Sequence, residues 1–273
     1  MYIGLQVIWR GAFQQFKSNG GCNMGRVKGL SFGGPVRGWL VAGAISVMMV
    51  FVGCGGDDGD NNPGNQGGGG GSQFNPDINY GSLTDTRDGK TYRTVVIGSQ
   101  TWMAENLNYN ASGSACYNNA PDSCAKYGRL YDWATVMDGA SSSTLSPSGV
   151  QGICPSGWHV PSDAEWTALT IAVGGWSTAG TKLKSATGWN TGSGCIPGTN
   201  DYGFSALPGG NGFSGGNFNY AGNYGIWWSA TEKDASLTRG RFMYYDNDDM
   251  DSGSGSKTHL YSLRCVRDSA APQ

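Results

Sequence analysis

Hydrophobic residues between positions 83 and 268 come in short runs separated by clusters of Gly, Asn and Ser. Runs of this length, bounded by turn-forming residues, predict short β-strands joined by long loops. Asp88-Gly89 and Gly98-Ser99 supply turn signals on either side of the first run. The predicted strands are residues 91–97, 101–104, 225–232, 241–245 and 260–267.

A helical period replaces this pattern in residues 127–137, YGRLYDWATVM. Leu130, Trp133, Ala134 and Met137 occupy positions i, i+3, i+4 and i+7. This spacing places all four side chains on one side of a helix. The sequence therefore predicts a helix with one apolar face.

A second helix is predicted to begin in CPSGWHVPSDAEW, residues 154–166. Ser162-x-x-Glu165 is a capping box, in which each of the two side chains accepts a hydrogen bond from the backbone amide of the other residue. We expect Trp166, in the first turns of this helix, to face the core. His159 has no obvious nucleophile or second histidine nearby, so we expect a partly buried polar residue rather than a catalyst.

The first 53 residues follow a different pattern. They contain five basic and no acidic side chains, and residues 39–53, WLVAGAISVMMVFVG, carry no charge. A basic segment before an apolar run of this length predicts a signal peptide over residues 1–53, because the run is short for a membrane-spanning helix. Met24 is the expected true start, since the residues before it add nothing that a signal needs.

The apolar run ends in Phe51-Val52-Gly53-Cys54, which resembles the bacterial lipobox, although that pattern prefers Leu where Phe51 stands. The resemblance implies cleavage before Cys54 and acylation of its thiol and its new amine. Several acyl chains together give stable membrane anchoring. The alternative is an ordinary signal peptide followed by an incidental cysteine.

Residues 54–82 predict a flexible tether, because the Gly-rich stretch 55–73 has no large apolar side chain to bury. Asp57, Asp58 and Asp60 resemble the surface-export signal of lipoproteins in the Bacteroidota. That resemblance implies display on the outer face of the bacterial outer membrane. A solvated spacer is the alternative.

One folded domain is expected over residues 83–268, with residues 269–273 as a tail. Loss of the signal peptide removes five of the 18 basic residues, which leaves 13 against 20 acidic residues and a net charge of −7. A domain of this charge is a poor binder of nucleic acid or anionic lipid. Attachment to the membrane would therefore be through the lipid.

Five cysteines follow Cys54 in the chain: Cys116, Cys124, Cys154, Cys195 and Cys265. Disulfides are expected in an exported domain, and an odd number leaves at least one cysteine unpaired. Spacing alone does not decide the pairing. We favour Cys116–Cys124, which closes the loop CYNNAPDSC, and Cys154–Cys265, which ties the helical half to the last strand. Cys195 is then left over.

Six segments occur in order from about residue 85 to residue 268: GKTYRTVVIGSQTWMAENLNY, YGRLYDWATVM, CPSGWHVPSDAEW, GFSALPGG, WWSATE and YSLRCVRD. Together they resemble the Fibrobacter succinogenes major paralogous domain. This family is known from secreted and lipid-anchored envelope proteins, and its biochemical role is largely undefined.

The pair VPSDAEW and LRCVR also resembles the C-type-lectin-like fold, which includes the formylglycine-generating enzymes. This second resemblance implies an α+β architecture. In it, two helices pack on a small, twisted, mostly antiparallel sheet with long loops and disulfides.

The composition of the loops favours a sugar ligand. They are rich in Tyr, Trp, Asn and Asp, whose rings stack on sugar C–H surfaces and whose polar groups bond hydroxyls. The candidate ligand-binding residues are Trp228, Tyr244, Tyr245 and Asn247. The alternative is that these side chains belong to the core or to irregular loops.

Calcium is a further hypothesis for the segment YYDNDDMDSGSG. Asp246, Asp248, Asp249 and Asp251 are close enough in sequence to share one ion, although their spacing is not that of an EF-hand. A solvated turn between two strands explains the same residues.

Three functions compete at this point. The preferred hypothesis is a non-catalytic cell-surface lipoprotein that mediates adhesion or recognises polysaccharide, or another surface protein, through a C-type-lectin-like domain. The second is a passive structural or protein-interaction module of the envelope. The third is an enzyme related to formylglycine-generating proteins, which is disfavoured because the late cysteine pair of those enzymes and the common catalytic motifs are missing.

Overall fold

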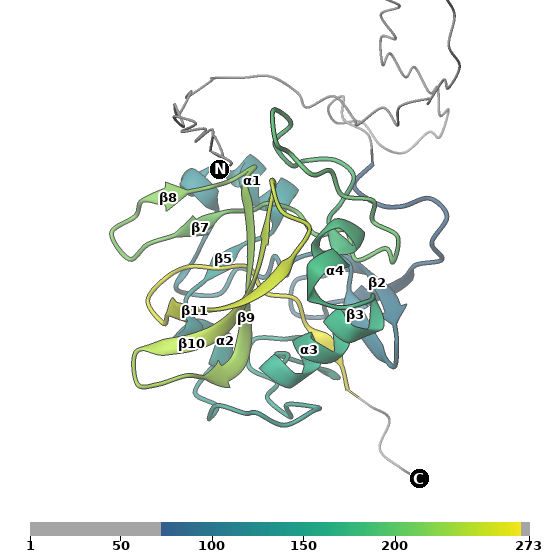
Figure 1. The fold of residues 1–273 in the computed structure, drawn as a ribbon. Coiled ribbons are helices and arrows are strands. Elements are labelled where there is room, and N and C mark those ends of the chain that lie inside the picture. The colour runs from purple at the N-terminus through teal and green to yellow at the C-terminus, as the bar shows by residue number, and fades with distance from the viewer. Residues whose placement is uncertain (1–71, 269–273) are drawn as a thin grey trace, which may run out of the picture. The chain divides into compact units, whose positions relative to one another are not determined.

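The computed structural model describes residues 72–268, which all fall within one compact unit. Helices α3 (Asp163–Ala172) and α4 (Trp176–Leu183) lie between two groups of strands (Figure 1). On one side are the long strands β9 (Tyr224–Glu232) and β10 (Leu237–Tyr244), and on the other is the hairpin of β2 (Thr91–Ile97) and β3 (Gln100–Met103). The α+β class predicted from the sequence is therefore correct. The predicted signal peptide and Cys54 lie outside the described residues.

The larger sheet has five antiparallel strands in the order β1-β2-β3-β12-β6. Its strands are β1 (Gly81–Thr84), β2 (Thr91–Ile97), β3 (Gln100–Met103), β6 (Trp158–His159) and β12 (Val266–Arg267). The turns on either side of β2 contain Gly89 and Gly98 at φ values of 73° and 61°. Glycine adopts this left-handed conformation without steric cost, which explains why the turn signals there were reliable.

The smaller sheet has three antiparallel strands in the order β11-β10-β9. They are β9 (Tyr224–Glu232), β10 (Leu237–Tyr244) and β11 (Met250–Ser256), and the first two confirm strands predicted from the sequence. Strand β11, with the sequence MDSGSGS, was not predicted as a strand. It is an edge strand of small polar residues after Met250, so it has no apolar pattern to reveal it.

The capping box at the start of α3 is present as predicted. Ser162 Oγ accepts the amide of Glu165 at 3.2 Å, and a Glu165 carboxylate oxygen accepts the amide of Ser162 at 3.0 Å. Trp166 is fully buried, which confirms that it faces the core.

The single helix predicted over residues 127–137 is wrong. Helix α1 (Pro121–Tyr127) ends at Gly128, which has a φ of 75°. A two-residue strand, β5 (Leu130–Tyr131), separates it from helix α2 (Trp133–Met137), and Asp132 caps α2 by accepting the amide of Thr135 at 2.7 Å. Gly128 ends one helix and Asp132 begins the next, so the apolar spacing across them does not produce one continuous helix.

The remaining elements are short. They are β4 (Ser114–Ala115), which pairs with β5, the 3-10 turn η1 (Tyr117–Asn119), and the paired strands β7 (Asn211–Gly212) and β8 (Phe218–Asn219). Among the helices of residues 72–268, none is both long and apolar enough to cross a membrane. Residues 73–80, inside the range predicted as a tether, contact the domain: Asn75 Nδ2 donates to the carbonyl of Asn200 at 3.1 Å, and the guanidinium of Arg93 lies 4.0 Å from the ring centroid of Phe74.

Aromatic side chains fill the space between the two sheets. Trp102, Trp166, Phe204 and Trp227 are fully buried, with ring centroids between 4.6 and 6.5 Å apart. The guanidinium of Arg264 lies 4.2 Å from the ring centroid of Phe204. The core therefore encloses a charged side chain as well as apolar ones.

The continuous strand predicted over residues 260–267 is also not observed. Only Val266–Arg267 forms a strand, between β3 and β6. Leu260, Tyr261 and Ser262 make single bridges to three other parts of the domain instead. The segment passes from the region of the smaller sheet to the larger one, so it cannot remain in one ladder.

Both predicted disulfides are present. Cys116 and Cys124, eight residues apart, are joined, and Cys154 and Cys265, 111 residues apart, are joined. Cys195 is free. The longer bridge links the segment before α3 to the segment before β12.

Removal of the two disulfides should destabilise the domain unequally. The chain-entropy account gives about 5 kcal/mol for the 111-residue separation and about 2.5 kcal/mol for the eight-residue one. We expect Cys154→Ser with Cys265→Ser to lower the free energy of unfolding in urea by the larger amount, and Cys116→Ser with Cys124→Ser by the smaller. Equal losses in the two double variants would contradict this account.

Candidate functional site

His159 of β6 lies between two carboxylates. Its Nε2 atom is 2.7 Å from Glu165 Oε1, its Nδ1 atom is 2.7 Å from Asp268 Oδ1, and its side chain is almost fully buried. Burial by itself would lower the pKa of His159, but the bonds and charges of Glu165 and Asp268 outweigh burial and raise the pKa above its usual value. With both ring nitrogens bonded, we assign the ring the role of joining β6, α3 and the end of the domain.

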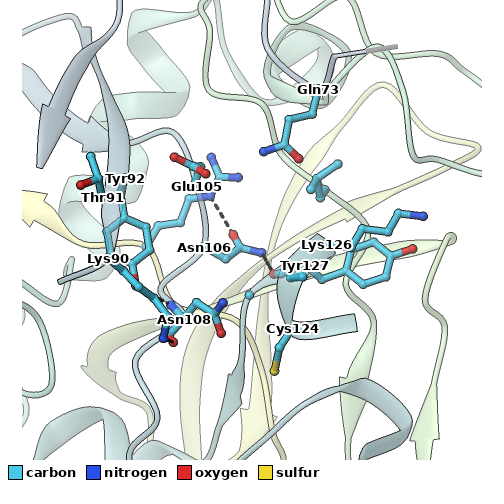
Figure 2. A pocket seen from close by; sticks show the side chains of 14 residues that line it. Gln73, Lys90, Thr91, Tyr92, Glu105, Asn106, Asn108, Cys124, Lys126 and Tyr127 are labelled. Atoms are coloured by element: carbon cyan, nitrogen blue, oxygen red, sulfur yellow. Dashed lines mark hydrogen bonds between the residues drawn. The ribbon is translucent and has the colours of Figure 1, made fainter. Parts of the chain in front are cut away.

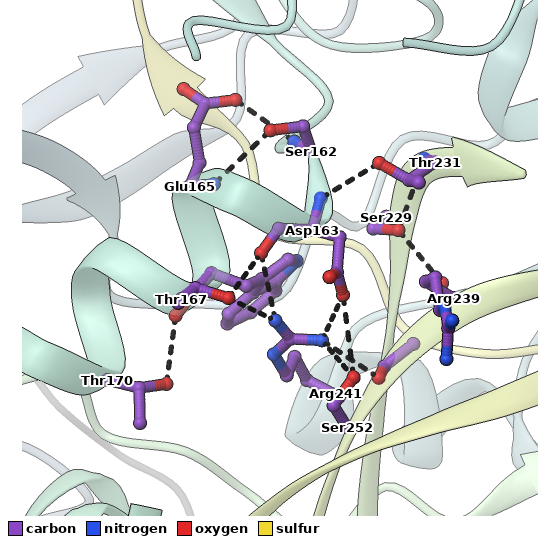
Figure 3. A network of polar contacts seen from close by, with 12 residues as sticks. Ser162, Asp163, Glu165, Thr167, Thr170, Ser229, Thr231, Arg239, Arg241 and Ser252 are labelled. Carbon is purple, nitrogen blue, oxygen red and sulfur yellow. Dashed lines mark hydrogen bonds and ion pairs between the residues drawn. The ribbon is translucent and has the colours of Figure 1, made fainter. Parts of the chain in front are cut away.

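A second polar network fixes the start of α3 to the smaller sheet (Figure 3). The fully buried guanidinium of Arg241 is bonded to the carboxylate of Asp163, to its carbonyl oxygen at 2.9 Å, and to the hydroxyls of Thr167 at 3.0 Å and Ser252 at 2.9 Å. The amide of Asp163 donates to Thr231 Oγ1 at 3.0 Å. Most of the polar side chains in CPSGWHVPSDAEW thus make bonds that connect parts of the fold to one another.

The structure corrects the expectation that Trp228 contacts a ligand. Its side chain is fully buried, its Nε1 donates to the carbonyl of Tyr131 at 2.6 Å, and its ring lies 4.3 Å from that of Tyr261. Residues of β9 are buried on both faces, because α3 covers one and the segment 260–263 covers the other. The ring therefore cannot stack on a sugar from solvent.

The other predicted ligand residues, Tyr244, Tyr245 and Asn247, are half-buried at the end of β10 and in the loop after it. The Tyr244 ring packs edge-on against Tyr224 at 5.0 Å. The side chain of Asn247 is turned inward, where Oδ1 accepts the amide of Asp249 at 2.6 Å. Asn247 therefore shapes its own loop.

A lysine ammonium lies inside the acidic loop for which calcium was considered. Lys184 Nζ donates to the carbonyl oxygens of Ile196 at 2.7 Å, Asn247 at 2.9 Å and Tyr244 at 3.0 Å, and the side chain is buried. Burial lowers the pKa of Lys184 to about 8, although the charges of Asp248 and Asp246 act in the opposite direction.

The ammonium thus bonds backbone oxygens at the end of β10, in the loop after it and at Ile196. Within residues 72–268, no three His, Cys, Asp or Glu side chains form a group that could bind a metal ion. The four candidate ligands, Asp246, Asp248, Asp249 and Asp251, are therefore not gathered around one position. Asp248 instead accepts a hydrogen bond from the hydroxyl of Thr181 in α4.

A polar cleft lies on another part of the domain, beside the C-terminal end of α1 (Figure 2). Lys90 and Asn108 line one side, Lys126 and Tyr127 line the other, and Asn106 lies between them (Figure 2). Asn106 is buried and donates its Nδ2 to the carbonyl of Tyr127 at 2.7 Å. This bond fixes the distance between the two sides.

Several polar groups at the cleft have no hydrogen-bond partner within residues 72–268. They are the side-chain amides of Gln73 and Asn108, the ammonium of Lys126 and the hydroxyl of Tyr127, all of which line the cleft. Such groups are bonded to water when the cleft is empty, and they can exchange water for a polar ligand. The cleft therefore offers donors and acceptors that the fold itself does not use.

Two charged groups lie at the cleft as well. Burial raises the pKa of Glu105, even though one of its carboxylate oxygens accepts the amide of Arg93 at 2.5 Å. Burial also lowers the pKa of Arg264 to about 9, and its guanidinium is bonded to Asn106 Oδ1 and to the carbonyls of Phe204 and Ser205. Arg264 is still positively charged at neutral pH, so the two charges partly offset each other.

Sequence reasoning missed this cleft because its residues come from distant parts of the chain. The segments are 90–92, 105–108 and 124–128, with Gln73 and Arg264. The one local signal is the pair of asparagines in AENLNY, where Asn106 is turned into the fold and Asn108 points to the cleft. The β2–β3 pairing brings the first two segments together, the bond from Asn106 to Tyr127 adds the third, and the pairing of β3 with β12 adds Arg264.

The molecule is an α+β domain with two disulfides and a polar cleft on its surface. Within residues 72–268 it has no group of side chains that could bind a metal ion. Residues 95–267 match the Fibrobacter succinogenes major domain. The chain belongs to this family, as the sequence motifs predicted. Searches of the curated proteins and of the solved structures gave no significant match.

The His159 network predicts a pH-dependent stability. Its pKa is higher in the folded state than the unfolded value of about 6.5, so the stabilisation by the protonated ring is fully present below about pH 6.5 and is lost as the pH rises through the folded pKa. We expect wild type to exceed Asp268→Asn in unfolding free energy below pH 6.5, by less than about 1 kcal/mol because Asp268 is exposed. Urea unfolding should show this excess shrinking at higher pH; an excess independent of pH would contradict it.

The three carbonyl oxygens that accept from Lys184 Nζ, which we call the Lys184 cage, predict that this one side chain contributes strongly to the stability of the domain. Lys184→Met leaves three part-buried carbonyls without their donor, so we expect the free energy of unfolding to fall by about 3 kcal/mol. The control is Lys182→Met, since Lys182 donates only to the carbonyl of Val173, and it should cost about 1 kcal/mol or less. The melting temperature of wild type should be the same in calcium and in chelator. A rise in calcium would show that the loop binds the ion despite Lys184.

Proposed function

We propose that this protein recognises polysaccharide without catalysing its conversion, and that sugar units bind in the polar cleft between Asn108 and Lys126. The observation that carries the proposal is the set of polar groups at the cleft that have no partner within residues 72–268. Natural ligand sites place a few such groups around a concave surface.

The chemistry of the cleft suits sugar hydroxyls. A hydroxyl both donates and accepts, so its recognition needs donors and acceptors side by side. The amides of Gln73 and Asn108 supply both, Lys126 supplies a donor, and Glu105 supplies an acceptor. The lining is too polar for a purely apolar ligand, whose binding would leave these groups without water.

Attachment to the cell surface completes the proposal. The lipobox-like sequence before Cys54 and the Gly-rich stretch after it support a lipid anchor with a tether, in the outer membrane of a bacterium. A tethered domain on that surface would meet extracellular polysaccharide and could mediate adhesion.

We propose in addition that the domain has the C-type-lectin-like fold that its sequence resembles. Its support is the combination of a capped α3, small antiparallel sheets, and a last strand joined by Cys154–Cys265 to the segment before α3. The cleft is built by loops and element ends around this frame, as binding sites commonly are.

Binding can be tested with the full chain purified in detergent, against soluble xylan, β-glucan and pectin. We expect saturable binding to at least one of them, and about a tenfold loss of affinity in Asn108→Ala. The matched control is Asn110→Ala, because Asn110 is an exposed asparagine outside the cleft lining. Binding by wild type that Asn108→Ala and Lys126→Ala both leave unchanged would overturn the assignment of the cleft.

A further inference from the structure

A row of tyrosines lies where the turn after β8 leads into β9. Tyr220 has the largest exposure among its aromatic neighbours, with 47% of its surface open to solvent. Its ring stacks on that of Tyr224, with centroids 4.5 Å apart and an angle of 21° between the planes. Tyr224 in turn lies against Tyr244 of β10. The Tyr224 ring therefore packs against one face of Tyr220, and Tyr244 packs against Tyr224.

The backbone of Tyr220 is in a conformation that disfavours a bulky side chain. Its φ is 70°, in the left-handed region that glycine and asparagine prefer. The turn imposes this conformation, since the carbonyl of Tyr220 accepts the amides of both Asn223 and Tyr224 at 2.9 Å. A residue kept in a strained conformation on the surface points to a function of its side chain.

An amide pair lies beside this turn. Asn190 Nδ2 donates to Asn223 Oδ1 at 2.6 Å, and the backbone amide of Asn190 donates to the carbonyl of Gly222 at 2.8 Å. Asn190 Oδ1 and Asn223 Nδ2 have no further partner within residues 72–268. One acceptor and one donor are therefore held side by side, which is the arrangement that a sugar hydroxyl can bridge.

The tyrosine turn and the cleft share a wall. Leu207 lines the cleft, the carbonyl of Pro208 accepts the amide of Gly222 at 2.9 Å, and the amide of Gly210 donates to the carbonyl of Tyr224 at 2.8 Å. The segment 207–210 therefore runs from the cleft lining at Leu207 to the tyrosine turn at Pro208 and Gly210. Even fully extended, these four residues span no more than about 14 Å, so the backbone segments that carry the two places lie close together.

We infer that the Tyr220–Tyr224 stack and the Asn190–Asn223 amide pair form a second sugar subsite, in which the open face of Tyr220 packs on a sugar ring. This inference rests on the proposed function of the cleft and extends it. The ligand is then a chain of several sugar units that occupies the cleft and the tyrosine subsite together, rather than a single sugar. Linked subsites gain affinity because the second contact is intramolecular.

Chain length and three variants of one residue test the inference. Xylan oligosaccharides from disaccharide to hexasaccharide, with matching β-glucan and pectin series, are titrated into the full chain in detergent. Wild type should bind the longest members most tightly. Tyr220→Ala should lose about fivefold in affinity for long chains and keep its affinity for short ones, which need only the cleft.

Tyr220→Phe and Tyr220→Gly separate the role of the ring from the role of the turn. Tyr220→Phe keeps the ring and should bind long chains like wild type. Tyr220→Gly relieves the strain at φ 70°, so it should be at least as stable as wild type on thermal unfolding and yet lose the long-chain affinity.

The outcomes distinguish the two proposals. Long-chain affinity that is unchanged in Tyr220→Gly, or wild-type affinity that does not rise with length, would overturn the tyrosine subsite while Asn108→Ala still tests the cleft. Long-chain binding that depends on Tyr220 and not on Asn108 would support the tyrosine subsite and overturn the cleft. No binding of any series would overturn both.

Discussion

The eight residues 260–267 constrain the whole domain, because they bond to β5, to the smaller sheet and to the larger sheet within one short segment. Tyr261 bridges to Tyr131 and Ser262 to Trp227, which ties β5 to β9. Arg264 is held in the aromatic core by Asn106 and two carbonyls, Cys265 is bonded to Cys154, and Val266 pairs with both β3 and β6. A charge buried this deeply is tolerated because each of the three guanidinium nitrogens donates a hydrogen bond. The core must therefore assemble around the end of the chain.

The same constraint places the cleft. Asn106 accepts from Arg264 and donates to the carbonyl of Tyr127, so the buried guanidinium orients the residue that sets the cleft width. Asn106 also accepts from Trp227 Nε1 at 2.8 Å, which connects it to β9. The polar groups of the cleft are thus carried by a rigid floor, and binding there would not need to order the backbone.

Local signals in the sequence were reliable where the chemistry is local. The capping box of Ser162 and Glu165, the glycine turns around β2 and the short disulfide each involve residues close in sequence. The helix over residues 127–137 failed because Gly128 and Asp132 interrupt an apolar period that looked continuous. The exposure of Trp228 could not be predicted, since a strand covered on both faces has no alternation that separates core from surface. The cleft, the Lys184 cage and the wall at residues 207–210 depend on contacts between distant segments, for which a single sequence gives no pattern.

The Lys184 ammonium connects the scaffold to the proposed tyrosine subsite. It bonds the carbonyl of Tyr244, whose ring packs against Tyr224, and the next residue, Tyr245, donates its amide to the carbonyl of Asn223 in the tyrosine turn at 2.9 Å. An ammonium on the chain itself can neither dissociate nor be removed by a chelator, whereas a bound calcium ion can. The loop that supports the rings proposed to hold the sugar chain is therefore held in place by a cation that is covalently part of the protein.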